Sequence, residues 1–156
     1  MVPVEIRTLL GNSRTGFTPI EDVERFDGDH DYVEGSLCIE VDGVPFLTAD
    51  YWDDVNWLWP FVVKASRDCE ATGHGETMFP DQPIKFSVDR LGNSGRLRLS
   101  LTATDLSETA VASASEYYEA LAGAGLRFFE HLERLAPGAA DSDQDEIAAL
   151  KRWQRS

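Results

Sequence analysis

Apolar and polar residues alternate along several short stretches of the chain, and such alternation predicts half-buried β-strands. The alternating stretches are residues 2–9, 37–41, 44–48, 84–89 and 97–103. Asp42-Gly43 lies between two of them, and this pair tolerates the positive φ that a tight hairpin turn requires. A second glycine-rich turn, residues 92–95, separates two others. Short turns of this kind predict antiparallel strand pairing.

The run from Asp50 to Cys69 is dense in apolar residues and holds three of the four tryptophans. Asp50 is a candidate N-cap, and Asp53 and Asp54 would then lie near the positive end of the helix dipole. The apolar positions recur at helical spacing and nearly close the circle; they include Trp52, Val55, Trp57, Leu58, Trp59, Phe61, Val62 and Val63. We therefore expect a central helix that is buried on most sides and kinked at Pro60, which lacks an amide proton.

A second helix is predicted to begin after Ser113, because Ser113 and Glu116 have the spacing of a capping box. Residues 109–113 fit either a further strand or the start of this helix. Gly123 and Gly125 lie in its middle, where glycine costs about 1 kcal/mol relative to alanine. We expect these glycines to allow close approach of another backbone or of a bulky ring, and the central tryptophans are the candidates.

Together these elements predict an α+β fold, with an antiparallel sheet of about six strands and helices packed on one face. The order along the chain is β-β-β-α, then β-β-β-α, then a short final α. Residues 1–138 are expected to form a single domain. Residues 139–156 are expected to form an acidic linker and a short C-terminal helix that docks on this domain through Ile147, Leu150 and Trp153.

The charge of the chain is strongly negative: 28 Asp and Glu residues stand against 14 Lys and Arg residues, and the formal net charge is -14. Residues 1–60 hold thirteen of these acids and three arginines, so they alone contribute -10. Such a charge repels nucleic acids and anionic membranes, which bind clusters of Lys and Arg. It attracts basic proteins and speeds their encounter with the chain. Solubility alone is the alternative explanation.

The chemical motifs of the chain are incomplete. Carboxylates alternate from Asp27 through Asp29 to Asp31, as in a calcium loop, but Tyr32 and Cys38 occupy the positions of the required glycine and glutamate. No nucleophile–base set, paired-acid signature or zinc ligand set can be assigned, and we predict no metal and no cofactor. The basic residues of the second half fit either a solvated sheet face or a contact with an anion; they are Lys85, Arg90, Arg96 and Arg98.

The N-terminal residues lack the basic and apolar regions of a signal peptide, and two cysteines do not make a disulfide framework. The apolar run of the central helix is shorter than the roughly 20 residues that span a bilayer. We therefore expect a cytoplasmic protein that does not bind membranes.

The stretch from Gly35 to Gly43, followed by Trp52-Asp-Asp-Val and Leu58-Trp59, resembles small uncharacterised bacterial domains. Some of those domains resemble the immunity proteins of toxin systems. The resemblance covers a hairpin and the tryptophan-rich start of a helix, and no catalytic residues come with it. It implies a compact acidic α+β protein that binds and blocks a basic partner.

Three hypotheses about function follow. The first is a non-enzymatic, immunity-like protein that binds a basic protein partner. Its candidate contact residues are Asp27, Asp29, Asp31, Asp53 and Asp54, whose carboxylates would steer and pair with Lys and Arg. The second is a small-molecule-binding protein or enzyme with a pocket lined by Trp52, Trp57 and Trp59. The third is a structural subunit of a homo-oligomer, and both a monomer and a homodimer remain open.

Overall fold

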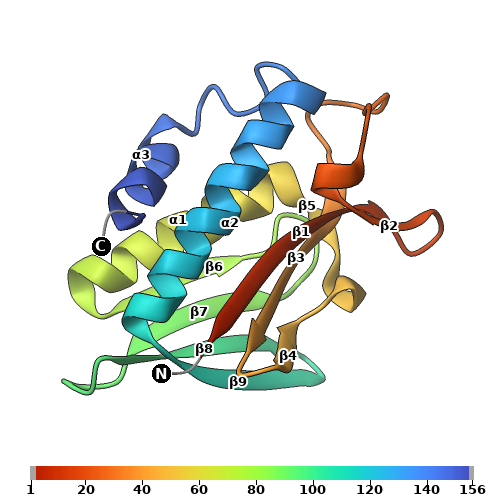
Figure 1. Cartoon of the computed structure of the whole chain (residues 1–156). Helices are drawn as coiled ribbons and strands as arrows, with labels where there is room; N and C mark the ends of the chain where they lie inside the picture. The colour runs from red at the N-terminus through yellow and green to blue at the C-terminus, as the bar shows by residue number, and fades with distance from the viewer. Residues whose placement is uncertain (1–2, 155–156) are drawn as a thin grey trace.

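The computed structural model describes residues 3–154 and contains two antiparallel sheets and three α-helices. Two of the helices lie against the sheets, and the third packs on the outside of this helix pair (Figure 1). The α+β class and the antiparallel pairing predicted from the sequence are confirmed. The predicted strand position of Val2 and the last two residues of the predicted C-terminal region lie outside the described residues.

The first sheet has the strand order β2-β1-β3-β4, and β5 pairs with the beginning of β3. Its strands are β1 (Val4–Asn12), β2 (Gly16–Pro19), β3 (Glu34–Val41), β4 (Val44–Leu47) and β5 (Asp53–Asp54); two 3₁₀ helices, η1 (Ile20–Asp22) and η2 (Ala49–Tyr51), belong to its connections. The predicted turn joins β3 to β4, where Asp42 and Gly43 have φ of 54° and 77°. The inner face of β1 and β3 buries Val4, Ile6, Leu37, Ile39 and Val41.

The second sheet is formed by four strands in chain order: β6 (His74–Met78), β7 (Lys85–Arg90), β8 (Arg96–Ala103) and β9 (Leu106–Ser113). Residues 109–113 therefore belong to a strand. Within residues 3–154 the chain forms nine strands in two sheets, which corrects the expectation of a single smaller sheet. β2, β5 and β6 are not among the predicted strands, because they are short or polar and show no alternation.

The helices are α1 (Val55–Thr72), α2 (Ala114–Leu135) and α3 (Gln144–Trp153). α1 packs against β3, β6 and β7, so it contacts both sheets, whereas α2 packs along β1 and α3 packs on α1 and α2. Gly75 of β6 approaches α1 so closely that an added Cβ would lie 1.7 Å from the carbonyl oxygen of Ala65. No helix in the described part of the chain has the length and apolar character needed to cross a lipid bilayer.

The start of α1 differs from the expectation. The helix begins at Val55 rather than directly after Asp50, because η2 and β5 occupy the predicted first turn. Asp53 and Asp54 instead pair with the beginning of β3, which lies far away in the sequence. Helical periodicity cannot reveal such a pairing, since it reads only local spacing. Pro60 lies inside α1 and is buried.

Trp59 of α1 connects this helix to β1 and α2 in the core. Its Nε1 donates a hydrogen bond to Oγ1 of Thr8 on β1 at 2.9 Å, and its ring stacks on Phe128 of α2 with the centroids 5.6 Å apart. Gly125 of α2 makes room for this ring: an added Cβ would lie 3.0 Å from Trp59 and 2.8 Å from Leu150 of α3. The predicted close approach of a tryptophan to the glycines of α2 is confirmed at Gly125.

Gly125→Ala is expected to destabilise the fold by about 1–3 kcal/mol, because its methyl group would press on the buried Leu150 and Trp59. Gly123→Ala is the matched control. Its nearest neighbour is Nη1 of Arg127 at 3.4 Å, so the higher helix propensity of alanine should stabilise the fold by about 0.5–1 kcal/mol. Urea unfolding followed by circular dichroism measures both effects, and equal stabilisation by the two variants would contradict the tight packing.

Candidate functional site

Five carboxylates surround a pocket of about 340 Å³ beside the start of α1. They come from the beginning of β3, from the η2–β5 segment and from the loop that precedes β7. The lining residues are Glu34, Asp50, Trp52, Asp53, Asp54, Asp81 and Gln82. Within residues 3–154, no Lys, Arg or His lines this acidic pocket or forms an ion pair with its carboxylates. No basic side chain among these residues therefore neutralises the carboxylates of the pocket.

Asp53 has a structural role in this pocket. It is 3% exposed, and its Oδ2 accepts the backbone N–H groups of Asp81 and Gln82 at 3.1 and 3.0 Å. Its Oδ1 accepts the N–H of Asp54 at 2.7 Å, and the side-chain amide of Gln82 donates to the carbonyl oxygen of Trp52. The expectation that Asp53 faces solvent is therefore wrong, because this buried carboxylate is needed to hold the loop before β7 against β5.

Asp54 forms the half-buried wall of the same pocket. Burial, followed by the negative charges of Asp53, Asp81 and Glu34, raises the pKa of the Asp54 carboxyl from 3.8 to about 6. The raised pKa means that the ionised form of Asp54 is less favoured in the folded protein than in water. A positive charge placed in the pocket would relieve this repulsion and lower the pKa again.

The predicted carboxylates before β3 lie on an exposed loop. Oδ1 of Asp29 accepts the N–H of Asp31 at 2.9 Å, which shapes the turn. Asp27 lies 3.6 Å from Nε of Arg25, but both side chains are 80% exposed, so this ion pair is weak and leaves Asp27 accessible. Tyr32 follows Asp31 and is 60% exposed, which makes it one of the most exposed large hydrophobic side chains in residues 3–154.

The three tryptophans of the central segment do not share one pocket. Trp52 is half-buried and lines the acidic pocket. Trp57 is 42% exposed and lines a separate hollow of about 250 Å³, and its Nε1 donates to the carbonyl oxygen of Asp31 at 2.7 Å. Trp59 belongs to the core and is 0% exposed. The expectation that Trp57 is buried is wrong, because its side of the first turn of α1 faces the loop that contains Asp31.

These residues form one surface, which we call the acidic–aromatic face. Its members are Asp29, Asp31, Tyr32, Glu34, Asp50, Trp52, Asp54, Trp57 and Asp81. Glu34 joins two parts of it, because it lines both the acidic pocket and a neighbouring hollow of about 470 Å³ that Asp29 and Tyr32 also line. Trp57 is joined to the same loop by its hydrogen bond to the carbonyl oxygen of Asp31. Asn56 of α1 fixes the loop: it accepts the N–H of Val33 at 2.9 Å and donates to the carbonyl oxygen of Asp31 at 3.0 Å.

Four members of this face are not site candidates in the sequence analysis: Tyr32, Glu34, Asp50 and Asp81. Tyr32 could have been recognised from the sequence, because it is an aromatic residue at the end of a polar loop and does not belong to an apolar pattern. Asp81 carries none, because only the fold brings its loop to β5. Among residues 3–154, no group of three or more His, Cys, Asp and Glu side chains has the arrangement needed to hold a metal ion.

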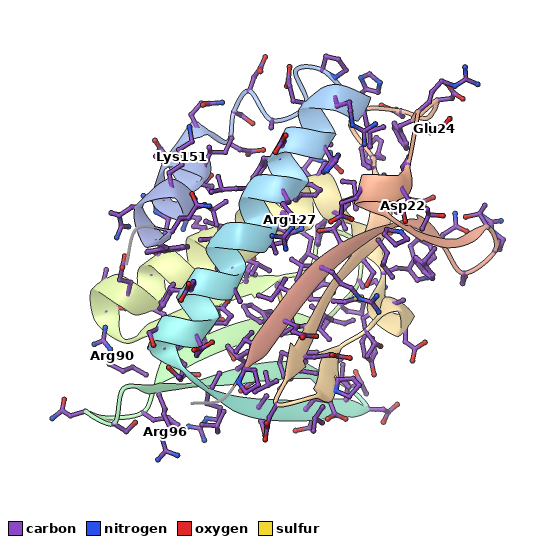
Figure 2. The ribbon with its side chains drawn as sticks, in the orientation of Figure 1. Asp22, Glu24, Arg90, Arg96, Arg127 and Lys151 are labelled. Atoms are coloured by element: carbon purple, nitrogen blue, oxygen red, sulfur yellow. The ribbon has the colours of Figure 1, made fainter. Side chains whose placement is uncertain are left out.

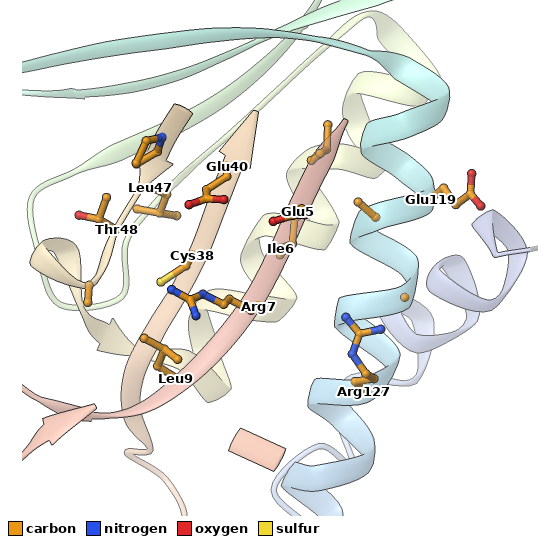
Figure 3. A pocket seen from close by; sticks show the side chains of 15 residues that line it. Glu5, Ile6, Arg7, Leu9, Cys38, Glu40, Leu47, Thr48, Glu119 and Arg127 are labelled. Atoms are coloured by element: carbon orange, nitrogen blue, oxygen red, sulfur yellow. The ribbon is translucent and has the colours of Figure 1, made fainter. Parts of the chain in front are cut away.

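A larger cavity of about 600 Å³ lies elsewhere, along β1 and β3 and beside α2 (Figure 3). Arg7 extends from β1 over Cys38, its neighbour on β3 (Figure 3). The charged residues that line this cavity mix both signs: Glu5, Arg7, Glu40, Glu119 and Arg127. Because the two signs alternate across its wall, this cavity lacks the uniform charge of the acidic–aromatic face.

Comparison with models of protein families, with curated proteins and with solved structures finds no match for this chain. Its function is therefore inferred from the geometry of the acidic–aromatic face.

Asp53→Asn is expected to destabilise the fold by about 1–3 kcal/mol, because its new NH₂ group would face a backbone N–H that has lost its acceptor. Asp50→Asn, at an exposed carboxylate in the same pocket, should change the stability by less than about 0.5 kcal/mol. Chemical denaturation measures both variants. Similar stabilities of the two would show that Asp53 does not hold the loop.

Asp54 is expected to make the protein less stable as the pH rises. Its pKa is higher in the folded chain than in the unfolded chain, so between pH 3.8 and about 6 the folded state keeps a proton that the unfolded state releases. Stability from this group is therefore lost as the pH rises through that window. Asp54→Asn should be more stable than the wild type by about 1 kcal/mol at neutral pH, after allowance for solvent screening.

This gain should disappear below about pH 3, where Asp54 is protonated in both states. Urea unfolding at a series of pH values tests the dependence, with Asp27→Asn on the exposed loop as the control. A gain of equal size at acidic and neutral pH would disprove the role of the Asp54 charge.

Proposed function

We propose that this protein is a non-catalytic binding protein that holds a basic protein partner on its acidic–aromatic face and thereby blocks the partner's surface, as an immunity protein does. The observation that carries this proposal is the position of two exposed aromatic rings, Tyr32 and Trp57, among carboxylates that have no basic partner within residues 3–154.

Charge supports a basic partner. A Lys or Arg side chain that enters the acidic pocket would lie among Glu34, Asp54 and Asp81. Burial, and then the neighbouring negative charges, raise the pKa of Asp54 in the free protein. A bound cation would offset the part of this shift that comes from the neighbouring negative charges, which favours a basic partner. The net charge of -14 also steers a basic partner toward this protein over long distances.

The aromatic rings support a protein rather than a simple cation as the partner. Tryptophan and tyrosine are the side chains that most often dominate the binding energy at protein interfaces. The Trp57 ring is held by its hydrogen bond to Asp31, so little side-chain entropy is lost when a partner covers it. Asn56 fixes the loop next to it, which prepares the face for binding before the partner arrives.

Affinity capture with immobilised wild-type protein tests this proposal. The expected partner is a basic protein that is retained at about 0.05 M salt and largely released at about 0.5 M salt, because screening weakens charge pairing between exposed groups. Asp31→Asn combined with Asp54→Asn should reduce retention mainly at low salt. Trp57→Ala should reduce it at both salt concentrations, because burial of the ring does not depend on charge.

The matched control replaces Asp105 and Glu108 by Asn and Gln and Val111 by Ala, at exposed positions on and before β9 away from this face. These changes remove the same charge and a comparable exposed apolar side chain. If the control and the face variants lost retention equally, net charge alone would explain the binding. Retention of no basic protein at low salt would refute the proposal.

A further inference from the structure

A second cavity, of about 420 Å³, lies between the C-terminal end of α1, the turn that joins β7 to β8, and the N-terminal end of α2. Its lining residues are Cys69, Glu70, Arg90, Gly92, Asn93, Gly95, Arg96, Leu97, Ala114 and Tyr118. Two of these are arginines, and Figure 2 shows Arg90 and Arg96 at the same corner of the molecule. Two arginines in one cavity are unexpected in a chain with a net charge of -14.

Glu70 does not neutralise these arginines, because its carboxylate is already used. Its Oε1 lies 2.9 Å from Nη1 of Arg152, and its Oε2 accepts a hydrogen bond from Nε1 of Trp153 at 3.0 Å. Within residues 3–154, neither Arg90 nor Arg96 forms an ion pair with a carboxylate. The cavity therefore carries the positive charge of two guanidinium groups.

The two arginines differ in how firmly the fold holds their side chains. Nη2 of Arg90 donates to the carbonyl oxygens of Cys69 and Glu70 at 3.1 and 2.9 Å, which fixes this guanidinium at the end of α1 and leaves its other N–H groups for a ligand. The Arg96 side chain makes no hydrogen bond with residues 3–154 and is exposed. It can therefore close over a ligand. The positive end of the α2 dipole, at Ala114, adds to the same field.

The buried Leu97 and the half-buried Tyr118 form the apolar part of the lining, and the Tyr118 hydroxyl already donates to the carbonyl oxygen of Ser66. We propose that this cavity binds a small organic oxyanion, a carboxylate or phosphate monoester carried on an apolar group, with Arg90 and Arg96 on the oxyanion and Leu97 and Tyr118 on the apolar part. Arginine suits this role because its N–H groups match the oxygens of carboxylate and phosphate.

This site is independent of the proposed protein partner. It adjoins the C-terminal end of α1, whereas the acidic–aromatic face adjoins the N-terminal end of the same helix. Figure 2 places Arg90 and Arg96 at the opposite corner from Asp22 and Glu24, which belong to the acidic N-terminal part of the chain. Either function can therefore fail without affecting the other.

Titration of ¹⁵N-labelled protein, followed by amide chemical shifts, tests the site. Phenyl phosphate and benzoate are the probes for the two kinds of oxyanion, and benzyl alcohol is the neutral probe that shares their ring. At least one anionic probe should give shifts at Gly92, Asn93, Gly95 and Ala114 that saturate at millimolar concentration. Benzyl alcohol and inorganic phosphate should bind these positions more weakly, because each lacks one half of the recognised group.

Arg96→Gln should weaken binding of the preferred probe by about tenfold, the typical effect of losing a hydrogen bond to a charged group. Arg98→Gln is the matched control, since Arg98 is an exposed arginine of the same strand that does not line the cavity. Circular dichroism confirms that both variants fold. Shifts that do not saturate, equal losses in the two variants, or equal binding of inorganic phosphate and phenyl phosphate would overturn the proposal.

Discussion

The burial of one indole ring determines how the sheets and helices of this protein meet. Trp59 donates to Thr8 on β1, stacks on Phe128 of α2, and occupies the space that Gly125 leaves free. Leu150 of α3 packs against the same glycine. A buried indole N–H without an acceptor would be costly, so the hydrogen bond to Thr8 fixes the register of α1 against β1. Because α1 also contacts the second sheet, this register sets where the residues at both of its ends lie.

Local patterns in the sequence predict much of the fold. Alternation finds the longer strands, Asp42-Gly43 predicts a real hairpin, and Ser113 caps α2 by accepting the N–H of Glu116. The errors occur where a segment is specified by distant partners. The helix cannot begin at Asp50 because the following residues pair with β3 and because Asp53 binds the loop at residues 81–82. The division into two sheets is likewise a property of tertiary packing, since nothing in the alternation records which strands are neighbours.

The candidate site is predictable only in part. The sequence indicates an acidic N-terminal region with tryptophans beside it, and both features appear in the acidic–aromatic face. It does not indicate which carboxylates are available to a partner. Asp53 accepts hydrogen bonds from backbone N–H groups, while Asp81 joins the pocket from another part of the chain. Nor does the sequence distinguish Trp57, which is exposed and faces Asp31, from Trp59, which lies two positions later and belongs to the core.

The charges at the two ends of α1 match its helix dipole. Carboxylates surround its positive end, and Arg90 donates hydrogen bonds to carbonyl oxygens at its negative end.

The close packing around Gly125 also restricts how this chain can change over evolution. A side chain at position 125 is accommodated without strain if Leu150 or Trp59 becomes smaller, because both lie within 3.0 Å of the Cβ that it would add. The three positions should therefore vary together, although they belong to three different helices. A divergent homologue that retained this helix arrangement would be recognisable by correlated substitutions at these positions, even where the strands and the charged surfaces had diverged beyond detection.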